Sequence, residues 1–379
     1  MYKAWLVAKG CSQVQCVDYD KTYTPVAQLS SLCTILTIAA RNDWDVDVFD
    51  FQSAFLNGKL NKGEGLYMEL PPGYKVNKRL RHAVAKLHVA LYSLKQGALK
   101  WYLKLCSSLQ ELRLGHMHLD WGIFYAQIGP NILILASHVD DCMLTRSSRE
   151  LMGLFKDKIR ARYKITDLGP ISWVLSMKVI QDCIARTISL SQEPYIDAII
   201  SKYNFSDLKP ISIPMDPSIQ LSQFSSPKSI ADTARMKNIP YRAAVGSLMY
   251  LTVGTCPDIV FAVSTVAQFC QDPRPEHWEA VKCIYRYLLG TKKLALTFGE
   301  GKQGLEGFTD ADGASQEHRH AISGYAYILD GGAVSWASKK QELVTLSTTE
   351  AEYVAATHAA KEGIWLRRLL IQRLSIRTC

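Results

Sequence analysis

Two adjacent aspartates interrupt one of the most apolar stretches of the chain. Asp140 and Asp141 lie between the run ILIL at residues 132–135 and the pair Met143-Leu144. Strand-like sequence on both sides of a short polar centre predicts a β-hairpin with acidic residues at its tip. The ordinary interpretation is a turn, where aspartate bonds its own backbone. The alternative is a site that needs two neighbouring carboxylates.

Another unusual acid lies in the strand-like segment 44–51. Alternation places Asp50 on the same face as Trp44, Val46 and Val48. Burying a carboxylate is costly unless a cation or hydrogen bonds compensate, so we expect a metal ion or a buried ion pair there, or else an exposed aspartate at a frayed strand end. Two such acidic sites could converge on a centre whose two metal ions lie about 4 Å apart, but local pattern does not establish convergence.

The 379 residues exceed the usual size of one hydrophobic core, so we expect two or three domains. Helical patterns flank the hairpin, which predicts an α+β domain over residues 1–204. A Ser- and Pro-rich linker follows at 205–240, and residues 241–300 return to helical patterning. The last segment, 301–379, is predicted to begin with a strand and a hairpin and to end in a helix. The predicted helices and hairpin strands are 29–42, 91–112, 149–163, 324–329 and 333–338.

The net charge of +9 favours polyanionic partners, because lysine and arginine release condensed counterions when they neutralise phosphates. The densest basic run, residues 75–86, fits either a nucleic-acid contact or a solvated surface loop. Ten cysteines are scattered without zinc spacing, which favours reduced thiols. No apolar stretch approaches the roughly 20 residues that span a bilayer, so no membrane partner is expected.

Several blocks resemble, in their order along the chain, those of copia-type retrotransposon Pol polyproteins. The resemblance covers essentially the whole chain. The blocks are YKAWLVAKG (2–10), DFQSAFLNG (50–58), LKQ (94–96), HVDD (138–141), GSLMYL (246–251), PDI (257–259), HWEAV (277–281) and STTEAEY (347–353).

The resemblance implies a reverse transcriptase with fingers and palm, then a helical thumb- or connection-like segment, then a partial ribonuclease H-like α/β domain. It implies that Asp50, Asp140 and Asp141 hold two Mg²⁺ ions and add deoxynucleoside triphosphates to a DNA primer on an RNA template. Phe55 would exclude the ribose 2′-hydroxyl, although an ordinary core phenylalanine would look alike. Gln96 matches a nucleotide-pocket position, although a surface glutamine would look alike. The oligomeric state is left open.

The tail resembles a ribonuclease H domain acting on an RNA/DNA hybrid. Asp310 and Glu352 match its first two acidic positions, whereas the Ser347–Glu350 spacing is that of a helix cap. The chain ends before the strand that would carry the family's next catalytic aspartate, so we expect little ribonuclease H activity. The family works in cytoplasmic particles before its DNA reaches the nucleus, but no segment encodes either address.

Five residues depart from the family pattern. His138 replaces a tyrosine, Trp5 and Cys256 each replace an arginine, and Ala98-Leu99 replaces a proline-arginine pair. Losing a guanidinium removes a bidentate phosphate ligand, which predicts impaired nucleotide binding. The alternative function is therefore a non-catalytic remnant or a domesticated nucleic-acid-binding module. A fragment that folds poorly is a third hypothesis.

Overall fold

The computed structural model of the chain describes residues 6–61, 63, 65–71, 73–74, 83–216, 221–222, 230–312 and 320–371. It combines helices and sheets, in agreement with the expected α+β class. Trp5, Leu374 at the end of the predicted tail helix, and residues 75–82 of the basic run lie outside the described residues. Within those residues, no helix is long and apolar enough to cross a membrane, and every cysteine is a free thiol.

The chain divides into two compact units. The first comprises Met1–Gln28 and Trp44–Pro170, and the second comprises Leu29–Asp43 and Ile171–Cys379. The helix at the start of the second unit therefore comes from the first tenth of the sequence.

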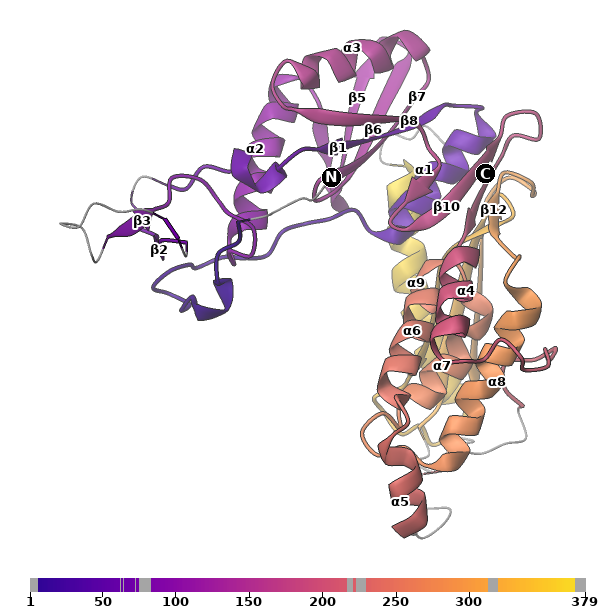
Figure 1. Cartoon of the computed structure of the whole chain (residues 1–379). Coiled ribbons are helices and arrows are strands. Elements are labelled where there is room, and N and C mark those ends of the chain that lie inside the picture. Colours follow the sequence, from indigo (N-terminus) through magenta and orange to yellow (C-terminus); the bar gives the residue numbers. More distant parts are fainter. Residues whose placement is uncertain are drawn as a thin grey trace. The chain divides into compact units, whose positions relative to one another are not determined.

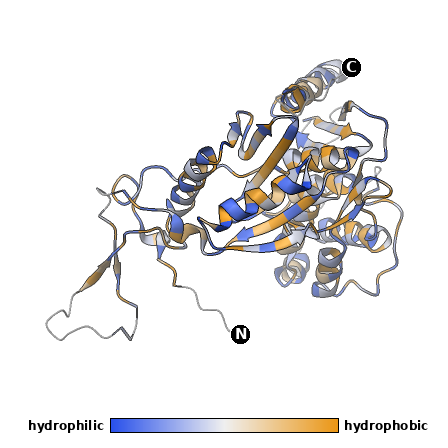
Figure 2. Cartoon of the chain, turned by 90° about the horizontal axis from the view of Figure 1, so that it is seen from above, coloured by the Kyte–Doolittle hydropathy of each residue, from blue (hydrophilic) through white to orange (hydrophobic). Residues whose placement is uncertain are grey.

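A six-stranded antiparallel sheet forms the centre of the first unit, with strand order β4-β5-β6-β7-β1-β8 (Figure 1). The central strands β1, β6 and β7 carry buried residues on both faces, and Figure 2 shows orange, hydrophobic stretches in the strands of the chain. The elements of this unit are η1 (Gly10–Ser12), β1 (Val46–Phe51), η2 (Ala54–Asn57), β2 (Tyr67–Glu69), β3 (Val84–Lys86), α2 (Gly97–Glu111), β4 (Gly115–Met117), β5 (Asp120–Ile128), β6 (Asn131–His138), β7 (Asp141–Arg146), α3 (Arg149–Arg160) and β8 (Ile165–Pro170).

Helices α2 and α3 contribute to one core with the central strands. Phe49 and Phe51 of β1 are buried in it, and Phe51 makes edge-to-face contacts with Trp101 and Tyr163. Helix α2 begins at Gly97, later than the apolar pattern predicted, because Ser93 takes a left-handed backbone conformation with φ of 71°.

The second unit holds a four-stranded sheet of order β12-β11-β10-β9, a three-stranded sheet of order β13-β14-β15, and a helical core. A short helix, α5, lies within the segment expected to be a linker. The elements are α1 (Leu29–Arg41), β9 (Trp173–Val174), β10 (Met177–Asp182), β11 (Thr187–Ser191), α4 (Glu193–Lys202), α5 (Ile230–Lys237), α6 (Tyr241–Gly254), η4 (Pro257–Ile259), α7 (Val260–Ala267), α8 (Pro275–Thr291), β12 (Leu296–Phe298), β13 (Leu305–Asp312), β14 (Ile322–Leu329), β15 (Gly332–Lys340) and α9 (Thr348–Ile371).

The early helix α1 is integrated into the second unit. It packs against β11, β12 and β15, and Arg41 at its end forms an ion pair with the buried Asp330. Asp330 also accepts a hydrogen bond from the backbone N–H of Gly304 at 3.0 Å. This network ties a helix from the start of the sequence to the β14–β15 turn, about 290 residues later.

Candidate active site

The structure brings the sequence-predicted acidic residues of the first unit together. Asp50 on β1 is the cross-strand partner of Asp141 on β7. The backbone N–H of Phe51 donates to the carbonyl oxygen of Asp140 at 3.0 Å. Because paired residues carry their side chains on the same face of a sheet, Asp50 and Asp141 are neighbours. Asp50 is partly buried and its strand is paired on both sides, so it does not lie at a frayed end.

A strained turn carries Asp140. Val139 and Asp140 connect β6 to β7, which confirms the predicted hairpin, and Val139 has a φ of 64°. Positive φ is a genuine outlier for a β-branched residue and persists only when the surroundings hold it. The indole N–H of Trp101 donates to the carbonyl oxygen of Val139 at 2.8 Å, and Trp101 is only 1% exposed. Trp101 therefore holds the acidic turn in place.

We expect Trp101→Phe to lower the free energy of unfolding by about 1–3 kcal/mol, because the Val139 carbonyl would lose its indole donor. It should also slow any reaction that depends on Asp140. Urea unfolding measures the first effect and primer extension the second. Trp121→Phe is the matched control, since Trp121 is 51% exposed. Equal losses in both variants would contradict the role of the Trp101 hydrogen bond.

The surroundings of Asp141 disfavour its negative charge. The pKa of Asp141 is raised, first because partial burial disfavours its charged form and then because Asp140 lies beside it. His138, the cross-strand partner of Asp141 on β6, opposes this shift. A bound cation would relieve the repulsion between the two aspartates.

Oxygen donors of this kind suit Mg²⁺, which is usually held by one or two carboxylates together with substrate phosphates and water. Within the described part of the chain, no three His, Cys, Asp or Glu side chains converge as a ready-made metal site. Asp50 and Asp141 could supply carboxylate ligands to a magnesium ion, whose remaining ligands would come from substrate and solvent. They do not form a closed protein cage.

Phe55 lies four residues beyond β1 in the short helix η2 and is partly buried. Its ring packs edge-on against that of Tyr92, with ring centroids 4.7 Å apart. Burial raises the pKa of the Tyr92 phenol, and the negative charges of Asp140 and Asp50 raise it further. Our sequence reasoning missed Tyr92, although it lies two residues before the block LKQ that we singled out.

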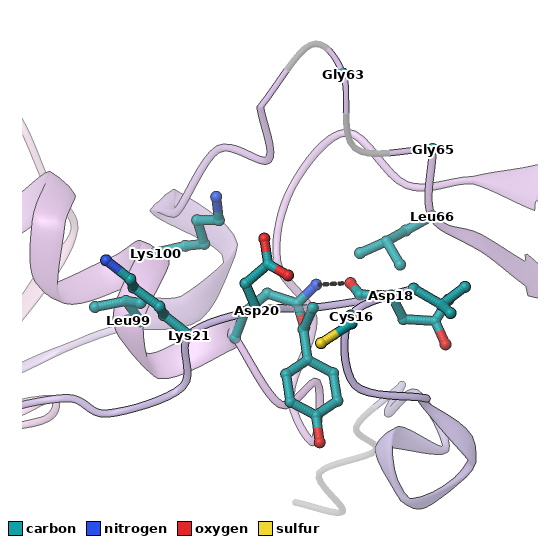
Figure 3. A pocket seen from close by; sticks show the side chains of 12 residues that line it. Cys16, Asp18, Asp20, Lys21, Gly63, Gly65, Leu66, Leu99 and Lys100 are labelled. Atoms are coloured by element: carbon teal, nitrogen blue, oxygen red, sulfur yellow. Dashed lines mark hydrogen bonds between the residues drawn. The ribbon is translucent and has the colours of Figure 1, made fainter.

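Gln96 is buried, not on the surface. Its amide N–H donates to the carbonyl oxygen of Asp18 at 3.0 Å, and its oxygen accepts from the amide of Gln13 at 3.1 Å. These bonds hold the N-terminal segment against the start of α2. Gln96 also lines a pocket of about 390 Å³ (Figure 3). The other lining residues are Cys16, Val17, Asp18, Tyr19, Asp20, Lys21, Gly63, Gly65, Leu66, Leu99 and Lys100.

The positions that depart from the family pattern fall in different places. Leu99 lines the pocket near Gln96, where the family pattern has an arginine. His138 pairs with Asp141, and its Nδ1 is a buried atom without a hydrogen-bond partner. Cys256 precedes η4 in the second unit, where burial raises its thiol pKa to about 12.

The acidic residues of the tail lie on two elements that pack together, β13 and α9. Asp310 on β13 and Glu352 on α9 are both exposed. Ser347 Oγ accepts a hydrogen bond from the backbone N–H of Glu350 at 3.1 Å, and the Glu350 carboxylate accepts from the N–H of Leu346 at 2.7 Å. Glu350 is therefore part of the helix cap, as its spacing predicted.

The pairing of β1 with the β6–β7 hairpin places two carboxylates side by side, and neighbouring carboxylates are typical of proteins that carry out metal-assisted phosphoryl chemistry. Comparison with known proteins specifies the class further. The family model for reverse transcriptase (RNA-dependent DNA polymerase) matches residues 1–217. The chain belongs to this family, and its relatives are Pol polyproteins of copia-type retrotransposons.

Three relatives match nearly the whole chain. The retrovirus-related Pol polyprotein from transposon TNT 1-94 of Nicotiana tabacum is 40% identical over 97% of the chain. Those from transposons RE1 and RE2 of Arabidopsis thaliana are 34% and 32% identical, each over 98% of the chain. The chain spans 28%, 25% and 25% of the length of these three relatives, respectively.

Proposed function

We propose that this chain is an RNA-directed DNA polymerase region that adds deoxynucleotides to a primer on an RNA template. The observation that carries the proposal is the cross-strand pairing of Asp50 with Asp141, next to Asp140 in the turn. Family membership supports the same substrate classes. Asp50, Asp140 and Asp141 would hold two Mg²⁺ ions between primer and nucleotide.

Bound magnesium would lower the pKa of the primer 3′-hydroxyl and stabilise negative charge on the nucleotide phosphates. The protein's own part is to pair Asp50 with Asp141 across β1 and β7 and to carry Asp140 in the adjoining turn, which Trp101 holds. Phe55 would exclude the 2′-hydroxyl of a ribonucleotide. Gln96 would act indirectly, because its amide already bonds Asp18 and Gln13.

We further propose that residues 1–204 act as fingers and palm, 241–300 as a thumb- or connection-like segment, and 301–379 as a ribonuclease H-like region. Residues 205–240 would join them. In the last region, the packing of β13 against α9 supports a shared site for Asp310 and Glu352, which would face an RNA/DNA hybrid.

Primer extension on an RNA template tests the polymerase. We expect magnesium-dependent incorporation by the wild type and at least about a hundredfold loss in Asp140→Asn, because a site preorganised for charge would lose an anionic ligand. Asp157→Asn is the matched control, since its side chain is 72% exposed on α3. Incorporation by Asp140→Asn at the rate of the control would refute the assigned site.

One observation favours a second function, binding without catalysis. Leu99 lines the pocket beside Lys21 and Lys100 where the family pattern has an arginine, so a phosphate there would lack a bidentate partner. A folded protein that incorporates no nucleotide but binds an RNA/DNA hybrid in a salt-dependent manner would support this alternative. Salt-insensitive or absent hybrid binding would exclude it.

A further inference from the structure

Tyr92 has no role in the mechanism above, yet it connects two of its parts. Its ring contacts that of Phe55 at a centroid distance of 4.7 Å and an interplanar angle of 60°. On the electrostatic side, the charges of Asp140 and Asp50 both act on its phenol. Tyr92 thus lies in the same neighbourhood as the acidic residues and the expected sugar-excluding ring.

The backbone at Tyr92 is firmly held by the N-terminal segment. The N–H of Ala8 donates to the carbonyl oxygen of Tyr92 at 3.1 Å, and Val7 forms a parallel bridge with Tyr92. Gly10 packs closely against Ser93, the residue after Tyr92. A Cβ added at Gly10 would lie 1.7 Å from the carbonyl oxygen of Ser93. Tyr92 is therefore a rigid support for whatever its side chain contacts.

Phe55 lies on a short element that packs against α2. Helix η2 has four residues and is entered through Ser53, whose φ is 55°. A partly buried ring on such a short helix needs a neighbour to fix its orientation. An edge-to-face aromatic contact favours one orientation of the two rings by roughly three- to tenfold. This preference is large enough to change how often the Phe55 ring occupies the position that blocks a 2′-hydroxyl.

We propose that Tyr92 is a specificity-determining positioning residue that holds the Phe55 ring where it excludes the ribose 2′-hydroxyl. The inference rests on the polymerase function proposed above. The ring of Tyr92, and not its hydroxyl, has the positioning role. Because the ring fixes Phe55, Tyr92→Phe keeps sugar discrimination. Tyr92→Leu removes the edge-to-face contact that fixes the orientation of the Phe55 ring, which lets ribonucleotides bind better.

The test measures equilibrium nucleotide binding, without catalysis. The full chain is bound to an RNA template and a DNA primer that ends in a dideoxynucleotide, and Kd is measured with Mg²⁺ for the matching deoxynucleoside and ribonucleoside triphosphates. We expect the Kd for the ribonucleotide divided by the Kd for the deoxynucleotide to fall roughly three- to tenfold in Tyr92→Leu. In Tyr92→Phe this ratio should stay at the wild-type value.

Tyr250→Leu is the matched control. Tyr250 forms an edge-to-face pair with Tyr195 at the same centroid distance, 4.7 Å, in the second unit. Removing this pair should leave the Kd ratio unchanged. If Tyr92→Leu does not fold, Tyr92→Met takes its place with the same expected fall, because a flexible chain fills the space without fixing the ring.

The outcomes separate the two proposals. A folded Tyr92→Leu or Tyr92→Met variant with the wild-type Kd ratio overturns the role of Tyr92 and leaves the polymerase proposal standing. A fall of equal size in Tyr92→Phe also overturns it, because the hydroxyl would then be the deciding group. A folded wild type that binds both nucleotides equally overturns this inference and leaves the polymerase proposal to primer extension. A folded wild type that binds neither nucleotide overturns both proposals.

Discussion

In metal-free buffer at neutral pH, Asp141→Asn is expected to melt at a higher temperature than the wild type. In buffer with Mg²⁺, it is expected to incorporate nucleotides at least about a hundredfold more slowly. The two effects have one cause. The surroundings of Asp141 disfavour its charge, through partial burial and through Asp140. An asparagine removes this repulsion and, with it, a ligand for the cation that the polymerase needs.

The pH dependence of this stability gain follows from the direction of the pKa shift. A carboxyl group whose pKa is raised in the folded state destabilises that state once it is ionised. The penalty is fully present at neutral pH. It disappears as the pH falls through the raised pKa and below the ordinary value of 3.8, where Asp141 is protonated in both states. The advantage of Asp141→Asn should therefore vanish in acid.

Thermal melts with and without Mg²⁺ check this prediction. Magnesium should raise the melting temperature of the wild type more than that of the variant, because it binds the folded state through the carboxylates. Asp157→Asn should show neither the gain in melting temperature nor the loss of activity, since Asp157 is exposed and paired with Arg160. A lower melting temperature for Asp141→Asn than for the wild type in metal-free neutral buffer would contradict the repulsion.

The second large effect concerns the stability of the first unit. We expect Lys156→Met to lower the free energy of unfolding by about 3 kcal/mol, because it removes the shared cation of two partly buried carboxylates. The Lys156 ammonium lies 2.6 Å from Asp47 Oδ2 on β1 and 2.7 Å from Asp167 Oδ1 on β8. Its side chain is 7% exposed.

The loss should depend on pH. Burial alone would raise the pKa of Asp167, but hydrogen bonds from Lys156 and from the N–H of Gly169 outweigh it and lower the pKa. A lowered carboxyl pKa adds stability above the ordinary pKa, and this contribution is lost as the pH falls through the folded-state value. The difference between wild type and Lys156→Met should therefore be largest near neutral pH and shrink in acid.

Urea unfolding followed by fluorescence measures this difference. Lys158→Met on the same helix is the matched control, and as an exposed residue it should change stability by less than about 0.5 kcal/mol. Adding Asp47→Asn and Asp167→Asn to Lys156→Met should recover part of the loss, because the unpaired charges disappear. Equal stabilities of the Lys156 and Lys158 variants would show that the triad contributes nothing.

Much of the local structure could be predicted from the sequence. The apolar runs around Asp140-Asp141 predicted the β6–β7 hairpin, and Ser347 with Glu350 predicted the cap of α9. Both features depend on residues that are close in the chain. The alternation in β1 predicted that Val46 and Val48 face the interior on the same side as Asp50. It did not predict that Phe49 and Phe51, on the opposite face, are buried as well.

The candidate site needed the tertiary structure. Local pattern could single out Asp50 and Asp141 as unusual, but the strands that carry them are some 90 residues apart, and only the pairing of β1 with β7 makes them neighbours. The same holds for Trp101 under Val139 and for Tyr92 beside Phe55. The sequence by itself determined which charged residues interrupt apolar strand patterns, since such patterns can be recognised from neighbouring residues alone. Which of them meet was decided by long-range strand register and side-chain packing, which no local pattern encodes.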